Sequence, residues 1–219
     1  MKHKKYTYCI PQPNQRGIHI HIPKTAGICI NNYLKQIAPE MVLSHASASF
    51  LKSRLNGRFP GFWDKMFKFA MVRNPWDRVV SLYLFSLRHG LPPTSFSDFV
   101  FKVRPLIDEY SIDLTLHDVF SQKPFLTDHQ TGAILVDFIG KMENFDEDFT
   151  YIRKRLGLKK LKKYRVINRQ NFKHYSKFYD QDTKELIRKR CAWEINKFGY
   201  KFEDCYDKKT DRYQLRKYI

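Results

Sequence analysis

A single turn near the N-terminus joins strand-like sequence to helix-like sequence. Apolar residues alternate over residues 17–22, a helical pattern over residues 27–38 stops at Pro39, and Pro-Lys-Thr-Ala lies between them. This layout gathers backbone N–H groups and the positive end of a helix around an anion, which predicts a phosphate site, although an ordinary strand-to-helix turn has the same pattern. Because Lys24 precedes Gly27, the order differs from the Gly-x-x-x-x-Gly-Lys-Ser/Thr loop of ATP-binding proteins and argues against a kinase.

A second strand, turn and helix with the same layout begins at residue 67. Residues 67–72 form a nearly continuous apolar run, typical of a buried parallel strand, and residues 76–87 carry a helical repeat. Arg73 follows the strand at its carboxyl end, where open α/β sheets bind ligands. Ser81 lies two turns into the helix, and a guanidinium with a hydroxyl suits a phosphate monoester. Two anion sites on neighbouring strands suit a nucleoside that carries phosphate at both ends.

The rest of the chain alternates strands and helices. We expect further helices at residues 44–55, 95–103, 146–156 and 180–198 and strands at residues 135–142 and 166–168, whereas residues 107–120 are ambiguous. This alternation predicts an α/β fold, a single domain with a central, mostly parallel sheet flanked by helices. The expected organisation is an irregular lead-in at residues 1–16, the folded domain at 17–203 and a basic tail at 204–219.

The charge of the chain is uneven. The net charge is +18, and residues 151–219 hold 22 lysines and arginines against 8 acidic residues. Such an excess favours an anionic partner such as a nucleotide, a glycan, nucleic acid or a membrane surface, although a solvated basic face is the plainer interpretation. The absence of an RRM, KH or zinc-finger signature argues against nucleic acid. Without a bilayer-length apolar run or a signal-peptide core, the sequence predicts a cytoplasmic protein with no membrane partner.

The histidines and cysteines of the sequence give little support for a metal site. The four cysteines include no Cys-x-x-Cys pair, so reduced thiols are expected. His19 and His21 share one face of the first predicted strand, but the sequence identifies no further ligands to join them. We therefore expect no metal.

The two turn motifs resemble those of the sulfotransferase superfamily, in its carbohydrate-type branch (sulfotransferase family 2-like). The matching segments read HIPKTAG at residues 21–27 and VRNPWDRVVSLY at residues 72–83, with weaker likeness at 136–145, 179–182 and 198–202. The resemblance spans roughly residues 17–203 and implies the P-loop-like sulfotransferase fold. It also implies metal-free transfer of a sulfuryl group from 3′-phosphoadenosine 5′-phosphosulfate (PAPS) to a hydroxyl of a carbohydrate or other small acceptor, leaving 3′-phosphoadenosine 5′-phosphate (PAP).

The same resemblance implies roles for individual residues. The first loop would hold the 5′-phosphosulfate with Lys24, which stabilises the leaving oxygen, and with the backbone amides that follow it. The second site would hold the 3′-phosphate with Arg73 and Ser81, and Lys173 or Arg169 would add a contact from a segment that folds over the nucleotide. The donor-binding residues of the first loop are Lys24, Thr25, Ala26, Gly27, Ile28 and Cys29.

Ile28 and Cys29 depart from the family pattern, because relatives usually carry Ser or Thr hydroxyls at these positions. Each missing neutral hydrogen bond is worth about 1 kcal/mol, which predicts weaker binding of the sulfuryl donor. The alternative function is a catalytically weak or inactive homologue that binds an anionic glycan or nucleic acid through its basic C-terminal third.

His45 is the proposed catalytic base. The resemblance implies that a histidine between the two motifs takes the proton of the acceptor, and the pKa of histidine suits that role. Packing or capping of the following helix is the alternative role for His45, and His129 is the competing base. The oligomeric state is left open.

Overall fold

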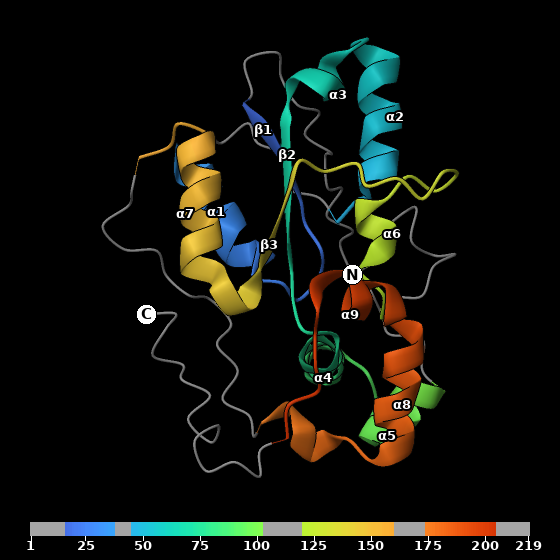
Figure 1. Ribbon diagram of the computed structural model, residues 1–219. Helices are drawn as coiled ribbons and strands as arrows, with labels where there is room; N and C mark the ends of the chain where they lie inside the picture. Colours follow the sequence, from blue (N-terminus) through green and yellow to red (C-terminus); the bar gives the residue numbers. More distant parts are fainter. Residues whose placement is uncertain (1–15, 38–44, 103–119, 160–173, 205–219) are drawn as a thin grey trace.

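The computed structural model describes residues 16–37, 45–102, 120–159 and 174–204. In these residues one parallel sheet has the strand order β1-β2-β3, formed by β1 (Gly17–Ile20), β2 (Phe67–Val72) and β3 (Phe138–Lys141). In the register of the central strand, Phe69 pairs with His19 on one side and with Phe138 on the other. Helices flank this sheet (Figure 1), so the predicted single α/β domain with a parallel sheet is confirmed.

Helices form a layer on each side of the sheet. Helices α1 (Gly27–Ile37) and α7 (Phe145–Arg155) lie on one side, and α2 (Ala48–Arg58), α6 (Lys123–Leu126) and α9 (Ala192–Phe198) lie on the other (Figure 1). Helix α4 (Pro75–Arg88) begins beyond the carboxyl end of β2, near α5 (Phe96–Phe101) and α8 (Gln181–Arg190). The short elements are α3 (Phe62–Lys65) and the 3-10 helices η1 (Met142–Asn144) and η2 (Tyr175–Phe178).

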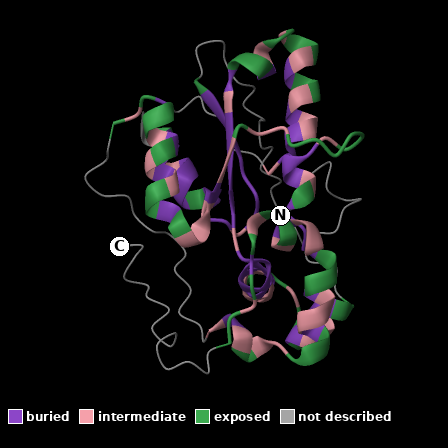
Figure 2. Cartoon of the chain, viewed as in Figure 1, coloured by how far each residue is buried: buried purple, intermediate pink, exposed green. Residues whose placement is uncertain are grey.

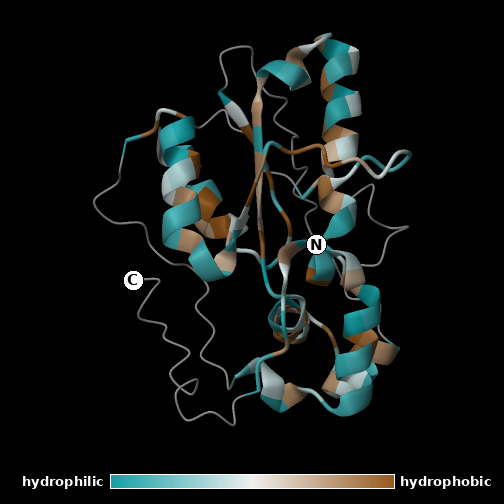
Figure 3. Ribbon diagram, viewed as in Figure 1, coloured by the Kyte–Doolittle hydropathy of each residue, from teal (hydrophilic) through white to brown (hydrophobic). Residues whose placement is uncertain are grey.

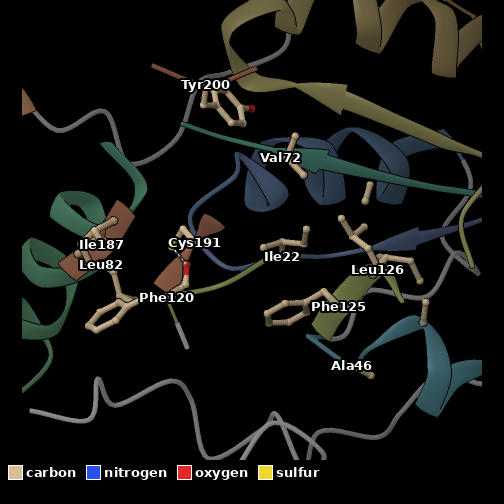
Figure 4. Packing of buried hydrophobic residues seen from close by; sticks show 14 of the residues in the cluster. Ile22, Ala46, Val72, Leu82, Phe120, Phe125, Leu126, Ile187, Cys191 and Tyr200 are labelled. Atoms are coloured by element: carbon tan, nitrogen blue, oxygen red, sulfur yellow. Dashed lines mark hydrogen bonds between the residues drawn. The ribbon is translucent and has the colours of Figure 1, made fainter. Parts of the chain in front are cut away.

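Alternation along β2 divides the core between the two faces of the sheet. Phe69 and Met71 belong to the cluster under α1 and α7, whereas Ala70 and Val72 belong to a larger cluster on the opposite face. Figure 4 shows part of this larger cluster, in which Ile22 lies near side chains of the segments that carry α6 and α9. Strands β1 and β2 and most of α4 are buried and β3 is mostly of intermediate burial, while the outer faces of the covering helices are exposed and polar (Figures 2 and 3).

The structure corrects several predicted element boundaries. Helix α2 begins at Ala48 rather than at residue 44, because the Ser47 hydroxyl accepts a hydrogen bond from Phe50 N and caps the helix there. Helix α3 was not expected. The first strand ends at Ile20, and the third strand is shorter than predicted. The strand expected at residues 166–168 lies outside the described residues.

The single helix predicted over residues 180–198 is wrong. The chain forms α8 and α9, with a break at Cys191, whose φ and ψ of −105° and 23° are not helical. The Cys191 thiol is buried and donates to the Phe120 carbonyl at 3.1 Å. After this break, Glu194 of α9 is fully buried.

Candidate anion-binding site

The loop after β1 has an unusual backbone. Lys24 and Ala26 both adopt positive φ angles, of 68° and 59°, although neither is glycine. Left-handed non-glycine residues cost of order 1–3 kcal/mol each and persist only where their surroundings hold them. Such residues cluster at ligand sites, so the strain of this loop is the first structural sign of function.

Three side chains hold the backbone of this loop through three successive carbonyls. Thr25 Oγ1 donates to Ile22 O at 2.8 Å. Arg78 Nε donates to Pro23 O at 2.9 Å, and Arg73 Nη1 donates to Lys24 O at 3.2 Å. Because these carbonyls accept hydrogen bonds from protein side chains, the conformation of the loop is fixed. The loop leads into the N-terminus of α1, and a helix N-terminus attracts anions.

Arg73 lies in the second predicted loop and is held at both its backbone and its side chain. Its N–H donates to Gln122 Oε1 at 3.0 Å and its carbonyl accepts from Gln122 Nε2 at 2.8 Å. Its guanidinium pairs with Asp77 at 2.8 Å. Because the same guanidinium reaches Lys24 O, the two predicted anion loops are directly connected.

One face of α4 runs from the second loop toward Lys24. Asp77, Ser81 and Phe85 follow one another at four-residue spacing, which places them in line on one helix face. Lys24 Nζ lies 4.3 Å from the centroid of the Phe85 ring. The structure therefore brings Lys24, Arg73 and the buried Ser81 to one face of one helix, as their assignment to a single two-ended site requires.

Arg78 was not among the residues predicted from the sequence. It is fully buried on α4, and besides Pro23 O it donates from Nη1 to Phe120 O at 3.0 Å. The nearby carboxylate of Glu194 is also buried and accepts a hydrogen bond from Gln122 N. Burial raises the pKa of Glu194, while the Gln122 N–H and the charge of Arg78 act to lower it. The sequence feature that could have identified Arg78 is a charged residue inside an otherwise apolar helical repeat.

A histidine group borders the first loop. Asn31 of α1 bridges two of its members, because His19 Nδ1 lies 2.8 Å from Asn31 Oδ1 and Asn31 Nδ2 lies 3.2 Å from His21 Nδ1. The His19 and His21 rings stack with centroids 5.5 Å apart, and the His45 ring meets the edge of His21 at 4.2 Å. The proposed base therefore lies beside the loop that carries Lys24.

Burial keeps the two inner histidines neutral. It lowers the pKa of His19 to about 4, against which the Asn31 hydrogen bond acts. Burial also lowers the pKa of His21 well below its usual value, and the charges of His45, His19 and Lys24 lower it further. At neutral pH each ring therefore offers one N–H and one lone pair.

The remaining predicted site residues occupy different environments. Ile28 projects from the first turn of α1 with 43% of its surface exposed, whereas Cys29 is buried and burial raises the pKa of its thiol. His129 is exposed on the loop after α6, with Nε2 3.3 Å from Pro124 O. Lys173 and Arg169 lie outside the described residues.

Gly27 is required for packing against His21. A Cβ at this position would lie 1.8 Å from His21 Nε2 and Cδ2. Because Asn31 holds the ring, we expect Gly27→Ala to lower the free energy of unfolding by about 1–3 kcal/mol, as overpacking does. The measurement is urea denaturation.

Gly57 provides the matched control, since it lies in α2 with no atom within 4 Å of its ideal Cβ. Gly57→Ala should raise stability by about 0.5–1 kcal/mol. Equal effects of the two substitutions would contradict the packing role of Gly27.

Neither a metal cluster nor a membrane span is present in the described part of the chain. No three His, Cys, Asp or Glu side chains are grouped there so as to hold a metal ion. Nor does any helix in residues 16–37, 45–102, 120–159 or 174–204 combine the length and apolar character needed to cross a membrane.

Comparison with known proteins gives two findings. The model of the sulfotransferase family (Sulfotransfer_2) matches residues 10–201. An uncharacterized protein from Archaeoglobus fulgidus is 29% identical over 96 residues, which cover 44% of this chain and 72% of that protein. The family match covers both turn motifs and every helix and strand described above.

Proposed function

Because this chain belongs to the sulfotransferase family, we propose that it transfers a sulfuryl group from PAPS to a hydroxyl of a carbohydrate or a similar small acceptor. PAPS, when bound, supplies an activated sulfuryl group and leaves as PAP. The chain has to bind two separate anionic groups, accept the proton of the acceptor hydroxyl and neutralise charge on the leaving oxygen.

The residues present fit such a ligand. The strained loop before α1 and the ammonium group of Lys24 suit the 5′ end, and the guanidinium of Arg73 with the hydroxyl of Ser81 suits the 3′-phosphate. The observation that carries the proposal is the hydrogen bond from Arg73 Nη1 to Lys24 O, because it makes two anion loops into one site.

Lys24 and His45 divide the proposed chemistry. Lys24 stabilises the leaving oxygen with a mobile positive charge. His45 accepts the acceptor proton, and its position against His21 supports this role over that of His129, which lies on an exposed loop. Labelled-sulfate transfer by His45→Ala tests the assignment, and activity retained in that variant would move the base to His129.

Titration with PAP, ATP and a DNA oligomer by calorimetry tests the function. We expect selective binding of PAP, weakened about 10- to 100-fold by Arg73→Ala, because a hydrogen bond to a charged group is worth about 1.5–3 kcal/mol. Arg188→Ala is the matched control, since Arg188 is exposed on α8 and pairs with Glu185.

Three outcomes would contradict the proposal. Equal binding of ATP and PAP would argue for a general phosphate site. Binding of PAP unchanged by Arg73→Ala would remove the 3′-phosphate assignment. Selective PAP binding without any sulfate transfer would instead favour the alternative of an inactive homologue, for which the exposed Ile28 gives a reason.

A further inference from the structure

His21 stands at the N-terminal end of α1. The edge of its ring, at Nε2 and Cδ2, occupies the place where a Cβ of Gly27 would lie, only 1.8 Å from that ideal position. Since the Cα–Cβ bonds of a helix point toward its N-terminus, this edge lies on the side of α1 where its free N–H groups attract an anion. Only 5% of the residue surface is accessible, so the place of the ring is fixed.

The Asn31 carboxamide sets which ring nitrogen of His21 carries the proton. Its Oδ1 accepts from His19 Nδ1 and its Nδ2 donates to His21 Nδ1. The flipped amide would give His19 an N–H at Nε2, and this buried atom has no hydrogen-bond partner among the described residues. An orphaned N–H is rarer than an orphaned lone pair, so the orientation observed is favoured. In that orientation the proton of neutral His21 is on Nε2.

The Nε2–H of His21 is a hydrogen-bond donor available to a ligand. Within the described residues the side-chain hydrogen bond of His21 is made by Nδ1, and Nε2 is not among the fully inaccessible atoms that lack a partner. The groups around the ring are His19, His45 and Lys24, and the positive charge of Lys24 is among the causes that keep His21 neutral. A neutral hydrogen-bond donor, the Nε2–H of His21, therefore lies beside Lys24, the cation assigned to the 5′ end of the sulfuryl donor.

We propose that His21, with its proton on Nε2, donates a hydrogen bond to the 5′-phosphosulfate of the sulfuryl donor. The inference rests on the proposed function and extends it. Ile28 and Cys29 provide no hydroxyl at the start of α1, and the imidazole N–H supplies a neutral hydrogen bond in place of those hydroxyls. His21 is thus a binding residue at the same end of the ligand as Lys24.

The test combines variants with a spectroscopic measurement. The amide nitrogen of glutamine can take the place of Nε2, whereas leucine has no donor. We expect His21→Gln to bind PAP within about threefold of the unchanged protein and His21→Leu to bind about five- to tenfold more weakly, the range of one neutral hydrogen bond. Arg188→Leu, at an exposed position of α8, is the control and should bind as the unchanged protein does.

Nitrogen NMR of the unchanged protein with labelled histidine decides the protonation of His21 without need of the His21→Leu variant. We expect a protonated Nε2 and a bare Nδ1 at His21, assigned by loss of the signal in His21→Gln, and a shift of Nε2 when PAP is added. A proton on Nδ1, or a Nε2 signal unmoved by bound PAP, would overturn the inference even if His21→Leu failed to fold.

The outcomes separate this inference from the function on which it rests. An unchanged protein that does not bind PAP contradicts the proposed function. Tight PAP binding that is equal in the unchanged protein and in His21→Leu contradicts only the role of His21.

Discussion

Replacing Arg78 with methionine should lower the free energy of unfolding by about 3–6 kcal/mol, because two buried carbonyls each lose a hydrogen bond from a charged group, worth about 1.5–3 kcal/mol apiece. The methionine fills much of the volume but donates nothing to Pro23 O and Phe120 O. It also removes a positive charge that acts to lower the pKa of Glu194, which burial raises. One of the three hydrogen bonds that hold the carbonyls of the first anion loop disappears at the same time, so PAP binding should weaken as well.

Urea denaturation measures this loss of stability, and the same helix supplies the control. Arg88 is exposed at the end of α4, and Arg88→Met should change stability by no more than about 0.5 kcal/mol. Adding Glu194→Gln to Arg78→Met should recover part of the loss, because the glutamine oxygen still accepts from Gln122 N and a neutral amide, unlike a carboxylate, needs no positive charge beside it. Strictly additive effects of the two substitutions would show that the charges do not interact.

The fold was predictable where local pattern and tertiary structure agree. The apolar run at residues 67–72 became the central strand, and the helical repeat after Arg73 became α4. Prediction failed where a distant contact overrode local pattern. At the break between α8 and α9 the Cys191 thiol donates to Phe120 O, 71 positions away in the chain, and no local periodicity reports such a contact.

The candidate site divides in the same way. The positions of Lys24, Arg73 and Ser81 beside one face of α4 were predictable because each stands at a set spacing from a strand end, and their binding roles stay predictions. Gln122 is hydrogen-bonded to the backbone of Arg73, and Glu194 accepts a hydrogen bond from Gln122 N. Both residues come from segments far along the chain and belong to no motif.

Gly27 shows that the structure can place a constraint on a residue that its sequence motif does not contain. In the sequence motif this glycine belongs to a loop predicted to hold an anion. The structure adds a second constraint, because the His21 ring fills the space that a side chain would need. Only the position of the strand relative to α1 reveals this constraint.

Acidification should destabilise the protein through His19. The pKa of His19 falls from 6.5 in the unfolded chain to about 4 in the folded protein, chiefly because the ring is buried. The unfolded chain therefore binds a proton between these two values while the native protein does not, so stability is fully present above pH 6.5 and is lost as pH falls. At about 1.4 kcal/mol per pH unit, the loss by pH 4 is about 3 kcal/mol.

Comparison with His19→Asn isolates this contribution. The amide of asparagine can take the place of His19 Nδ1 and donate to Asn31, but it does not titrate; the stacking on Phe69 is absent from this variant at every pH. We therefore expect the stability difference between the unchanged protein and His19→Asn to shrink by about 3 kcal/mol between about pH 7.5 and about pH 4. Urea denaturation at each pH measures it, with the exposed His129→Asn as the control substitution.

The variant is needed because two carboxyl groups act in the opposite direction. Burial raises the pKa of both Glu143 and Glu194, so the native protein binds their protons more tightly than the unfolded chain does. Their effect adds stability as pH falls and would mask part of the loss from His19 in the unchanged protein alone. Both groups are present in His19→Asn, so their contribution cancels in the difference. A difference that stays constant over this pH range would mean that His19 is not neutralised by burial, and the proton assignment along His19, Asn31 and His21 would have no basis.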